Sequence, residues 1–358
     1  MIEYFLGSYI ITAVGLLAAY FWGNHVHAGS GMTCVFIALV LGILEVSLSF
    51  DNAVVNAMKL EKMSEVWRHR FITWGIAIAV FGMRFLFPIL VVAIFAKLSM
   101  LEVFKVATTN ADKYAEYLHQ THASIVTFGG MFLIMLFFNY FFDHKKVVHW
   151  IRQIEQPLAH LDHMKGFEIV LSLLMLLITQ NFVPIEQKNP VMIAGISGII
   201  TYLLIDGFTH FLEKHEEKRA ASCAAKTVAS AGLISFIYLE LIDASFSLDG
   251  VLGAFALSKD IIIITIGLSI GAMFVRSLTI LLVEQKTLAR FRYLEHGAHW
   301  AIGALACLML VSTVKEVPEV VTGLIGLGFI VAAFISSVVH NKKTQNLLAQ
   351  DGESVVND

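Results

Sequence analysis

Long apolar runs, each close to the length of a membrane-crossing helix, dominate this sequence. A helix needs about 20 consecutive apolar residues to cross the hydrocarbon core of a bilayer. The runs are continuous, whereas strands of a membrane barrel alternate apolar and polar residues. We therefore predict an all-α polytopic membrane protein of about ten transmembrane helices. The predicted spans cover residues 4–22, 33–58, 70–96, 122–142, 167–182, 190–211, 228–257, 261–284, 297–312 and 318–339.

Charged residues are too few to cover a water-exposed surface. Asp, Glu, Lys and Arg make up 15% of the 358 residues, and apolar residues make up 57%. Soluble domains have about 25% charged and 45–50% apolar residues. The net charge of -3 offers no basic face for nucleic acid. The composition excludes a soluble enzyme, a disordered protein and a nucleic-acid-binding protein. The three cysteines are isolated and form no zinc or disulfide pattern.

Lysine and arginine gather in alternate connections between the predicted spans. If the N-terminus lies inside, most of the 25 basic residues fall on inside connections. Cytoplasmic loops of membrane proteins carry such an excess. We therefore expect a multi-pass protein of the cell inner (plasma) membrane with both termini in the cytoplasm. Residues 341–358 are polar and are predicted to form a disordered cytoplasmic tail.

An acidic motif of the second predicted span recurs in the seventh. The first copy reads Glu45-Val-Ser-Leu-Ser49-Phe-Asp51-Asn52, and the second reads Asp243-Ala-Ser-Phe-Ser247-Leu-Asp249-Gly250. A single arginine, Arg84 or Arg276, lies in the span after each copy. Matched motifs in spans two and seven indicate a five-span unit used twice. Because five is odd, the copies must have opposite orientations, as in many secondary transporters.

This repeat predicts the organisation of the chain. We expect a first transmembrane repeat over residues 1–182, a second over 183–340, and the tail over 341–358. The two copies would form inverted-topology five-helix repeats, with the acidic motifs meeting near the middle of the membrane.

Five carboxylates lie well inside the predicted spans, where each costs at least about 2.5 kcal/mol. We expect them to face a water-filled cavity, bind a cation or hold protons. Carboxylate, hydroxyl and carbonyl oxygens suit Mn²⁺, Mg²⁺ or Ca²⁺. The predicted metal site consists of Glu45, Asp51, Asn52, Glu240, Asp243 and Asp249, with Ser49, Ser247, Arg84 and Arg276 in support.

Several alternatives for these residues stay open at this point. Asn52 and Gly250 tolerate irregular backbone, so a local break after each aspartate would free carbonyl groups as further ligands. Arg84 and Arg276 can pair with carboxylates when no cation is bound, or can neutralise buried acids permanently. The acids themselves can form protonated contacts between helices. Such a contact explains Glu240 equally well, because it has no acidic counterpart in the first copy.

Other polar residues are less specific. Asp206 lies in the sixth predicted span and can join the cavity or serve helix packing. His296 and His299, three residues apart, can share a metal ion, but their place at the start of a span favours an interfacial role.

The motif residues carry a family resemblance. Leu48-Ser-Phe-Asp51-Asn52-Ala, the second motif, and the Gly75–Arg84 and Arg276-Ser-Leu stretches resemble signatures of the TerC (tellurium-resistance protein C) family, within the lysine-exporter-like superfamily. The resemblance covers about 45–95, 122–142 and 240–338, whereas 143–212 departs from the shortest members. Gly250 stands where that family commonly has serine. The resemblance implies export of a divalent metal, most often manganese, and maps its site onto Glu45, Asp51, Asn52, Asp243 and Asp249.

Together these features predict a divalent-cation exporter that favours Mn²⁺, with no enzymatic activity and no prosthetic group. Rocking of one repeat against the other would alternate access to the ion, and exchange for protons is compatible with carboxylate ligands. The alternative is a membrane scaffold or metal-loading factor for other proteins. An intramembrane hydrolase is disfavoured, because the sequence has no Gly-x-Gly-Asp or His-Glu-x-x-His motif.

Overall fold

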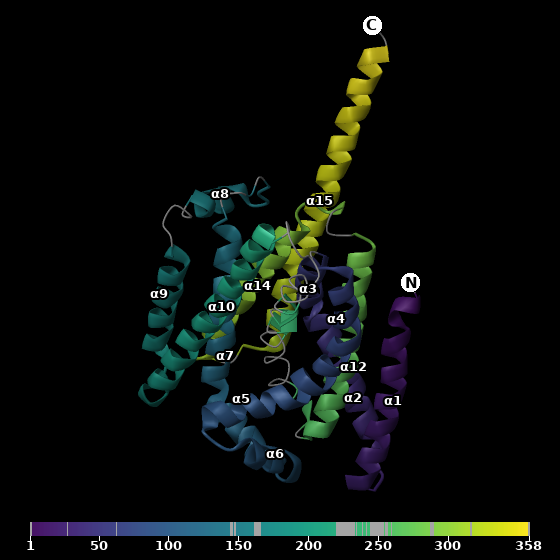
Figure 1. Ribbon diagram of the computed structural model, residues 1–358. Helices are drawn as coiled ribbons and strands as arrows, with labels where there is room; N and C mark the ends of the chain where they lie inside the picture. The colour runs from purple at the N-terminus through teal and green to yellow at the C-terminus, as the bar shows by residue number, and fades with distance from the viewer. Residues whose placement is uncertain are drawn as a thin grey trace.

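The computed structural model describes residues 2–26, 28–61, 63–143, 146, 148–160, 166–219, 260–286, 290–315 and 317–356, with single residues and short stretches between 233 and 258. Every regular element in these residues is a helix (Figure 1). The elements up to residue 109 are α1 (Ile2–Val26), α2 (Gly31–Leu48), α3 (Phe50–Glu61), α4 (Glu65–Ala77), the π-helix η1 (Ile78–Leu86), α5 (Phe87–Ala96) and α6 (Met100–Thr109). The later elements are α7 (Ala111–Phe141), α8 (Arg152–His160), α9 (Phe167–Phe182), α10 (Ile185–Arg219), α12 (Ile261–Glu284), α14 (Leu294–Ser312) and α15 (Glu319–Val356).

Helices long and apolar enough to cross a membrane make up most of the described chain. Six qualify: α1, α7, α10, α12, α14 and α15. The bent pair of α2 and α3 raises the number to seven, and α9 is a shorter apolar helix of 16 residues. These helices confirm the prediction of an all-α membrane protein with several spans. The predicted span 228–257 lies mostly outside the described residues.

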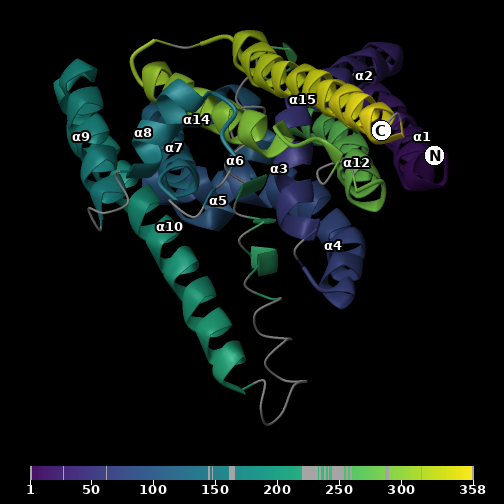
Figure 2. The same cartoon turned by 90° about the horizontal axis from the view of Figure 1, so that it is seen from above.

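Two central helices organise the bundle. α12 packs against α1, α2, α3 and η1, whereas α7 packs against α5, α9, α10 and α14. The two groups meet where α14 and α15 contact α3. In the view from above, α9 and α10 lie at the periphery, across the bundle from α1 and α2 (Figure 2). The short helix α3 therefore lies between the two groups.

Glycines on α12 let α2 approach it closely. A Cβ atom at Gly267 would lie 2.6 Å from Leu41 Cβ, and one at Gly271 would lie 2.7 Å from the carbonyl oxygen of Gly42. Small residues four apart allow helix backbones to meet in this way inside a membrane. At Gly271 the same space is filled by the side chain of Glu45, whose Cγ would lie 2.6 Å from the added atom. The glycine pair thus fixes a carboxylate at the helix interface.

The second predicted span bends one turn after Glu45. Ser49 separates α2 from α3, and the two helices meet at 55°. Hydrogen bonds continue through the bend, because the Ser49 amide donates to Glu45 and the Ala53 amide donates to Ser49. The sequence left open a local break after Asp51, beside Asn52. The structure instead has a bend at Ser49, which turns Asp51 and Asn52 into the first turn of a new helix.

The prediction of a disordered C-terminal tail was wrong. α15 continues without interruption to Val356, and in Figure 1 its last turns project away from the bundle. Extending an existing helix needs no new nucleation, which is the costly step of helix formation. The tail supplies leucine, alanine, glutamine and lysine, all good helix formers.

Candidate functional site

A row of buried polar side chains lies along α3. Asp51, Asn52 and Asn56 are each 5% exposed or less. The Asn52 side-chain nitrogen donates to a carboxylate oxygen of Asp243 at 2.6 Å, and the Asn56 side chain donates to Asn52 Oδ1 at 2.9 Å. The first bond joins residues that are 191 positions apart in the sequence. The two amides therefore connect both acidic motifs in one hydrogen-bonded chain.

Glu45 forms a buried ion pair with Arg84. Arg84 Nη2 donates to Glu45 Oε1, and the Ser49 hydroxyl donates to the same oxygen at 3.1 Å. Arg84 comes from η1, a π-helical segment of nine residues. Segments of this kind are rare and occur frequently at functional sites. η1 packs against α12, and its Arg84 side chain reaches Glu45 of α2.

Glu240 pairs with the second arginine. Arg276 Nη2 lies 3.5 Å from Glu240 Oε1, and both side chains are buried. The Arg276 guanidinium also lies over the ring of Phe71, 4.1 Å from its centroid, an arrangement favourable for a cation. Gly75 leaves room for this group, because an added Cβ would lie 2.7 Å from Arg276 Nη2.

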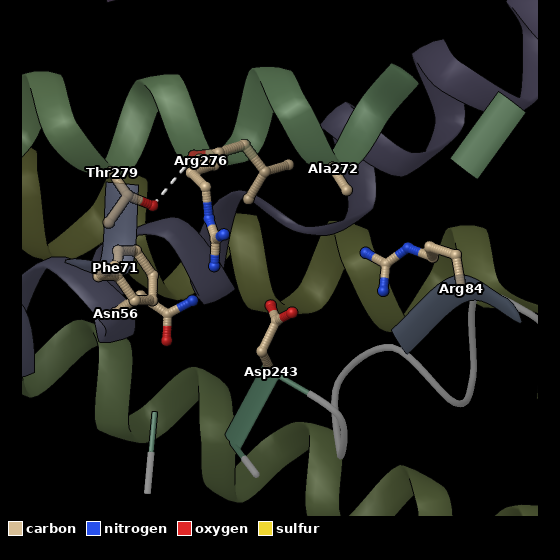
Figure 3. A pocket seen from close by; sticks show the side chains of 8 residues that line it. Asn56, Phe71, Arg84, Asp243, Ala272, Arg276 and Thr279 are labelled. Atoms are coloured by element: carbon tan, nitrogen blue, oxygen red, sulfur yellow. Dashed lines mark hydrogen bonds between the residues drawn. The ribbon is translucent and has the colours of Figure 1, made fainter. Parts of the chain in front are cut away.

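The two arginines and Asp243 line one small cavity. Its volume is about 10 Å³, close to the space of one water molecule, and Asn56, Phe71, Ala272, Val275 and Thr279 complete its wall. In Figure 3, Arg276 and Arg84 point from different sides toward the space above the Asp243 carboxylate. The cavity therefore lies between Asp243 of the second acidic motif and the two arginines.

Hydrogen bonding in this cluster is incomplete within the part of the chain that the structure describes. Buried atoms without a hydrogen-bond partner there include Asn56 Oδ1, Arg84 Nε and Nη1, Glu240 Oε2 and Arg276 Nη1. Leaving such atoms unpaired costs about 1–3 kcal/mol each, and more for charged groups. Buried atoms of both polarities, donors and acceptors, thus remain available to a ligand or to water.

Asp51 lies apart from the cavity. Its Oδ2 faces α15, where a Cβ at Gly326 would lie 2.9 Å away. Its Oδ1 accepts a bond from the backbone amide of Asn52 at 2.9 Å. Glu45 is close enough to interact with it electrostatically. Ser247, Asp249 and Gly250 lie outside the described residues.

The described residues bring most of the predicted site together but do not form a finished metal site. Among them, no three histidine, cysteine, aspartate or glutamate side chains converge closely enough to hold a metal ion. Arginines instead occupy the positions beside two of the carboxylates. Both interpretations of the arginines require this contact: pairing only while no cation is bound, and permanent neutralisation of the buried acids.

Three residues of the site were not predicted from the sequence. Asn56 lies one helical turn after Asn52, a spacing that places both amides on one face and was a usable signal. Phe71 lies in helix α4 and gave no signal, and Gly75 of the same helix entered only through the family resemblance, since the role of both depends on how α4 packs beside Arg276.

Asp206 and His299, possible cavity and metal residues in the sequence, contact other side chains. Asp206 Oδ1 accepts from Asn139 at 3.2 Å and lies 3.5 Å from the Tyr202 hydroxyl, so it links α10 to α7. His299 stacks on Tyr140, with ring centroids 3.4 Å apart. These contacts favour the packing and interfacial roles over the cavity and metal roles.

His296 belongs to a network that joins α8 to α14. His296 Nδ1 lies 2.9 Å from Glu155 Oε2, and Trp300 Nε1 donates to Glu155 Oε1 at 2.9 Å. The backbone amides of Trp150 and Ile151 donate to the same carboxylate at 2.8 and 3.2 Å. Burial by itself raises the pKa of Glu155, but the bonds from His296 and Trp300 outweigh burial and lower it to about 2. This connecting helix is thus fastened by an ionised carboxylate.

Apolar helices around a buried cluster of charged side chains define an integral membrane protein with several spans. The chain belongs to the family described as protein of unknown function, DUF475, whose model matches residues 50–344. The match includes every described residue of the cluster except Glu45 and Ser49, which precede it. No curated protein matches the chain. No solved structure matches it either.

Proposed function

We propose that this protein exports a divalent metal cation, with Mn²⁺ as the favoured cargo, from a site beside α3 and α12. The observation that carries the proposal is an imbalance of buried charge. Four carboxylates of the cluster are buried, Glu45, Asp51, Glu240 and Asp243, and two guanidinium groups, Arg84 and Arg276, accompany them. Within the described residues two negative charges remain, which equals the charge of one divalent cation or two protons.

The donor chemistry supports a hard cation. The cluster offers carboxylate oxygens, the amide oxygen of Asn56 and the hydroxyl of Thr279, with neither described cysteine among the residues of the cavity. Oxygen donors of this kind suit Mn²⁺, Mg²⁺ or Ca²⁺. Metal-bound carboxylates must be deprotonated, so binding and release of the ion would be linked to protons.

Before a metal ion binds, the two arginines would neutralise the carboxylates in its place. Arg276 Nη2 lies 3.5 Å from Glu240 Oε1, at the long end of a hydrogen bond. Within the described residues both arginines retain donors without a partner, and Glu240 Oε2 and Asn56 Oδ1 are acceptors without a partner. A cation entering the cavity would take over the carboxylates and displace a guanidinium toward another partner. Alternating access would then follow the exchange of arginine for metal.

The finer architecture belongs to the same proposal. Ten spans in two inverted five-helix repeats would place the acidic motifs of both halves at one depth, and the Asn52–Asp243 bond supports their proximity. The resemblance to the TerC family supports manganese as cargo. We place the chain in the cell inner membrane with both termini in the cytoplasm, and we assign it no enzymatic activity.

The test is metal flux in proteoliposomes. Purified wild type should move Mn²⁺, and Asp51→Asn, Asp243→Asn and Asp249→Asn should each slow the flux more than about tenfold, the size of effect typical of changes at metal sites. Glu186→Gln, at an exposed carboxylate in the first turn of α10, is the matched control and should transport normally. Absence of flux for every divalent ion in the wild type would refute the function, and normal flux in the three aspartate variants would refute the site.

The same variants separate transport from the scaffold or metal-loading alternative. A scaffold would keep its partners and its cellular role when Asp51 is replaced by asparagine, because shape and size are retained. An exporter would keep its fold and lose manganese efflux from cells. Cellular manganese content and co-purified proteins, measured on the same variant, distinguish the two functions.

A further inference from the structure

A second cavity lies between α9 and α14, and none of the charged residues around Asp243 lines it. It has a volume of about 470 Å³, within the range of sites that bind small molecules. The wall is apolar apart from Thr179, Cys307 and Lys315, and its remaining residues are Met175, Ile178, Phe182, Leu310, Val311 and Val314. Because α9 lies at the periphery of the bundle (Figure 2), this groove faces the surroundings of the protein and not its core.

The groove runs along the helices with a charge at one end. Its lining extends from Met175 to Phe182 on α9 and from Cys307 past the end of α14 to Lys315. Seven helical residues rise about 10 Å, so the groove follows the direction of an acyl chain through part of one leaflet. Lys315 is exposed, and it follows the last turn of α14. A lysine at this position reaches the headgroup level of the bilayer.

We propose that this groove binds one phospholipid with an anionic headgroup, its acyl chain between α9 and α14 and its phosphate on Lys315. Charge complementarity decides the occupant: among the described residues of the lining, one side chain is cationic and none is anionic. Basic pockets between membrane helices bind anionic headgroups in this manner. The lipid would fill the space between α9 and α14 and hold the peripheral pair of α9 and α10 against the core.

Native mass spectrometry of the full chain, titrated with phosphatidylglycerol or phosphatidylcholine of equal chain length, tests this assignment. Wild type should retain one phosphatidylglycerol, and Lys315→Gln should weaken it roughly fivefold, the contribution of one basic residue near a membrane surface. Thr179→Phe, which fills the groove, should weaken both lipids. Lys105→Gln, at an exposed lysine of α6 outside the groove, is the matched control and should bind as the wild type does.

Each outcome bears on the proposal. A fivefold preference for phosphatidylglycerol that Lys315→Gln removes, together with weaker binding of both lipids by Thr179→Phe, supports it. Equal binding of the two lipids by the wild type, a preference that survives Lys315→Gln, or unchanged binding by Thr179→Phe overturns it. Oleate that displaces phosphatidylglycerol completely and binds more tightly through Lys315 would also overturn it, since the occupant would then be a free fatty acid.

Discussion

The Asn52 side-chain amide donates a hydrogen bond of 2.6 Å to the carboxylate of Asp243, between motifs that are far apart in the chain. Asn52 is itself held by Asn56, whose amide donates to Asn52 Oδ1. A neutral donor thus restrains one carboxylate of the cluster, while arginines pair with Glu45 and Glu240.

Asn52→Ala should leave Asp243 without its amide donor. A buried acceptor that loses its partner costs about 1–3 kcal/mol, and more when it is charged. We expect a lower melting temperature in detergent and slower Mn²⁺ flux. Asn181→Ala is the control, because the Asn181 side chain is exposed and donates to a carbonyl group of its own helix. Equal effects of the two substitutions would contradict a special role for Asn52.

Arg84→Met should destabilise the protein strongly, by about 3–5 kcal/mol, because it leaves the buried Glu45 charge unpaired. Glu45→Gln should also destabilise the protein, because it leaves the buried Arg84 charge unpaired. The double variant should be less destabilised than the sum of the two single variants, since neither charge is then left alone. A double-mutant cycle from reversible unfolding in mixed micelles measures this coupling, and strict additivity would argue against the pair.

Gly271→Ala should separate α2 from α12. The added Cβ would lie 2.7 Å from the carbonyl oxygen of Gly42, a backbone atom that cannot yield without moving the helix. Overpacking of this kind costs about 1–3 kcal/mol. Gly207→Ala, in the open interior of α10 where an added Cβ meets nothing within 4 Å, should be neutral or stabilise by about 0.4–1 kcal/mol. Thermal unfolding of both variants checks the difference, and equal stability would show that the close approach is unimportant.

The contact of α8 with α14 through Glu155 should weaken in the acidic pH range. The pKa of Glu155 falls from 4.5 to about 2 in the folded protein. A lowered carboxylate pKa stabilises the fold fully above the unfolded value, and this stabilisation is lost as the pH falls from about 4.5 through about 2. Hydrogen exchange at the Trp150 and Ile151 amides, which donate to Glu155, should accelerate over this window beyond the intrinsic change.

Glu155→Gln should remove that pH step. Its exchange at neutral pH should resemble that of the acidified wild type, because the charged acceptor is absent. Glu168→Gln, at a partly exposed residue in the first turn of α9, is the control and should retain the step. Retention of the step in Glu155→Gln would assign the acidic transition to another group.

Much of the architecture follows from sequence patterns that act locally. Apolar runs of span length predicted helices in a membrane, because a bilayer leaves the backbone no partner except its own carbonyl groups. The same argument marked Glu45, Asp51, Asn52, Asp243, Arg84 and Arg276 as a group, since polar side chains in such helices are costly. These described residues are indeed buried. Asp249 and Ser247 stay predictions.

Only the tertiary structure decided which of these residues meet. The repeat alignment makes Asp243 the counterpart of Glu45, yet Arg276 pairs with Glu240 and Asn52 bonds Asp243. The bend at Ser49, the π-helix that carries Arg84 and the space left by Gly75 and Gly271 set these pairings. Such features depend on how close two helices approach, to within a few tenths of an ångström. The sequence by itself determined that charge must be buried in this membrane protein, because its spans contain the charged residues. Helix packing determined their partners, because ion pairs and hydrogen bonds form only at short distances between atoms that the chain keeps far apart in sequence.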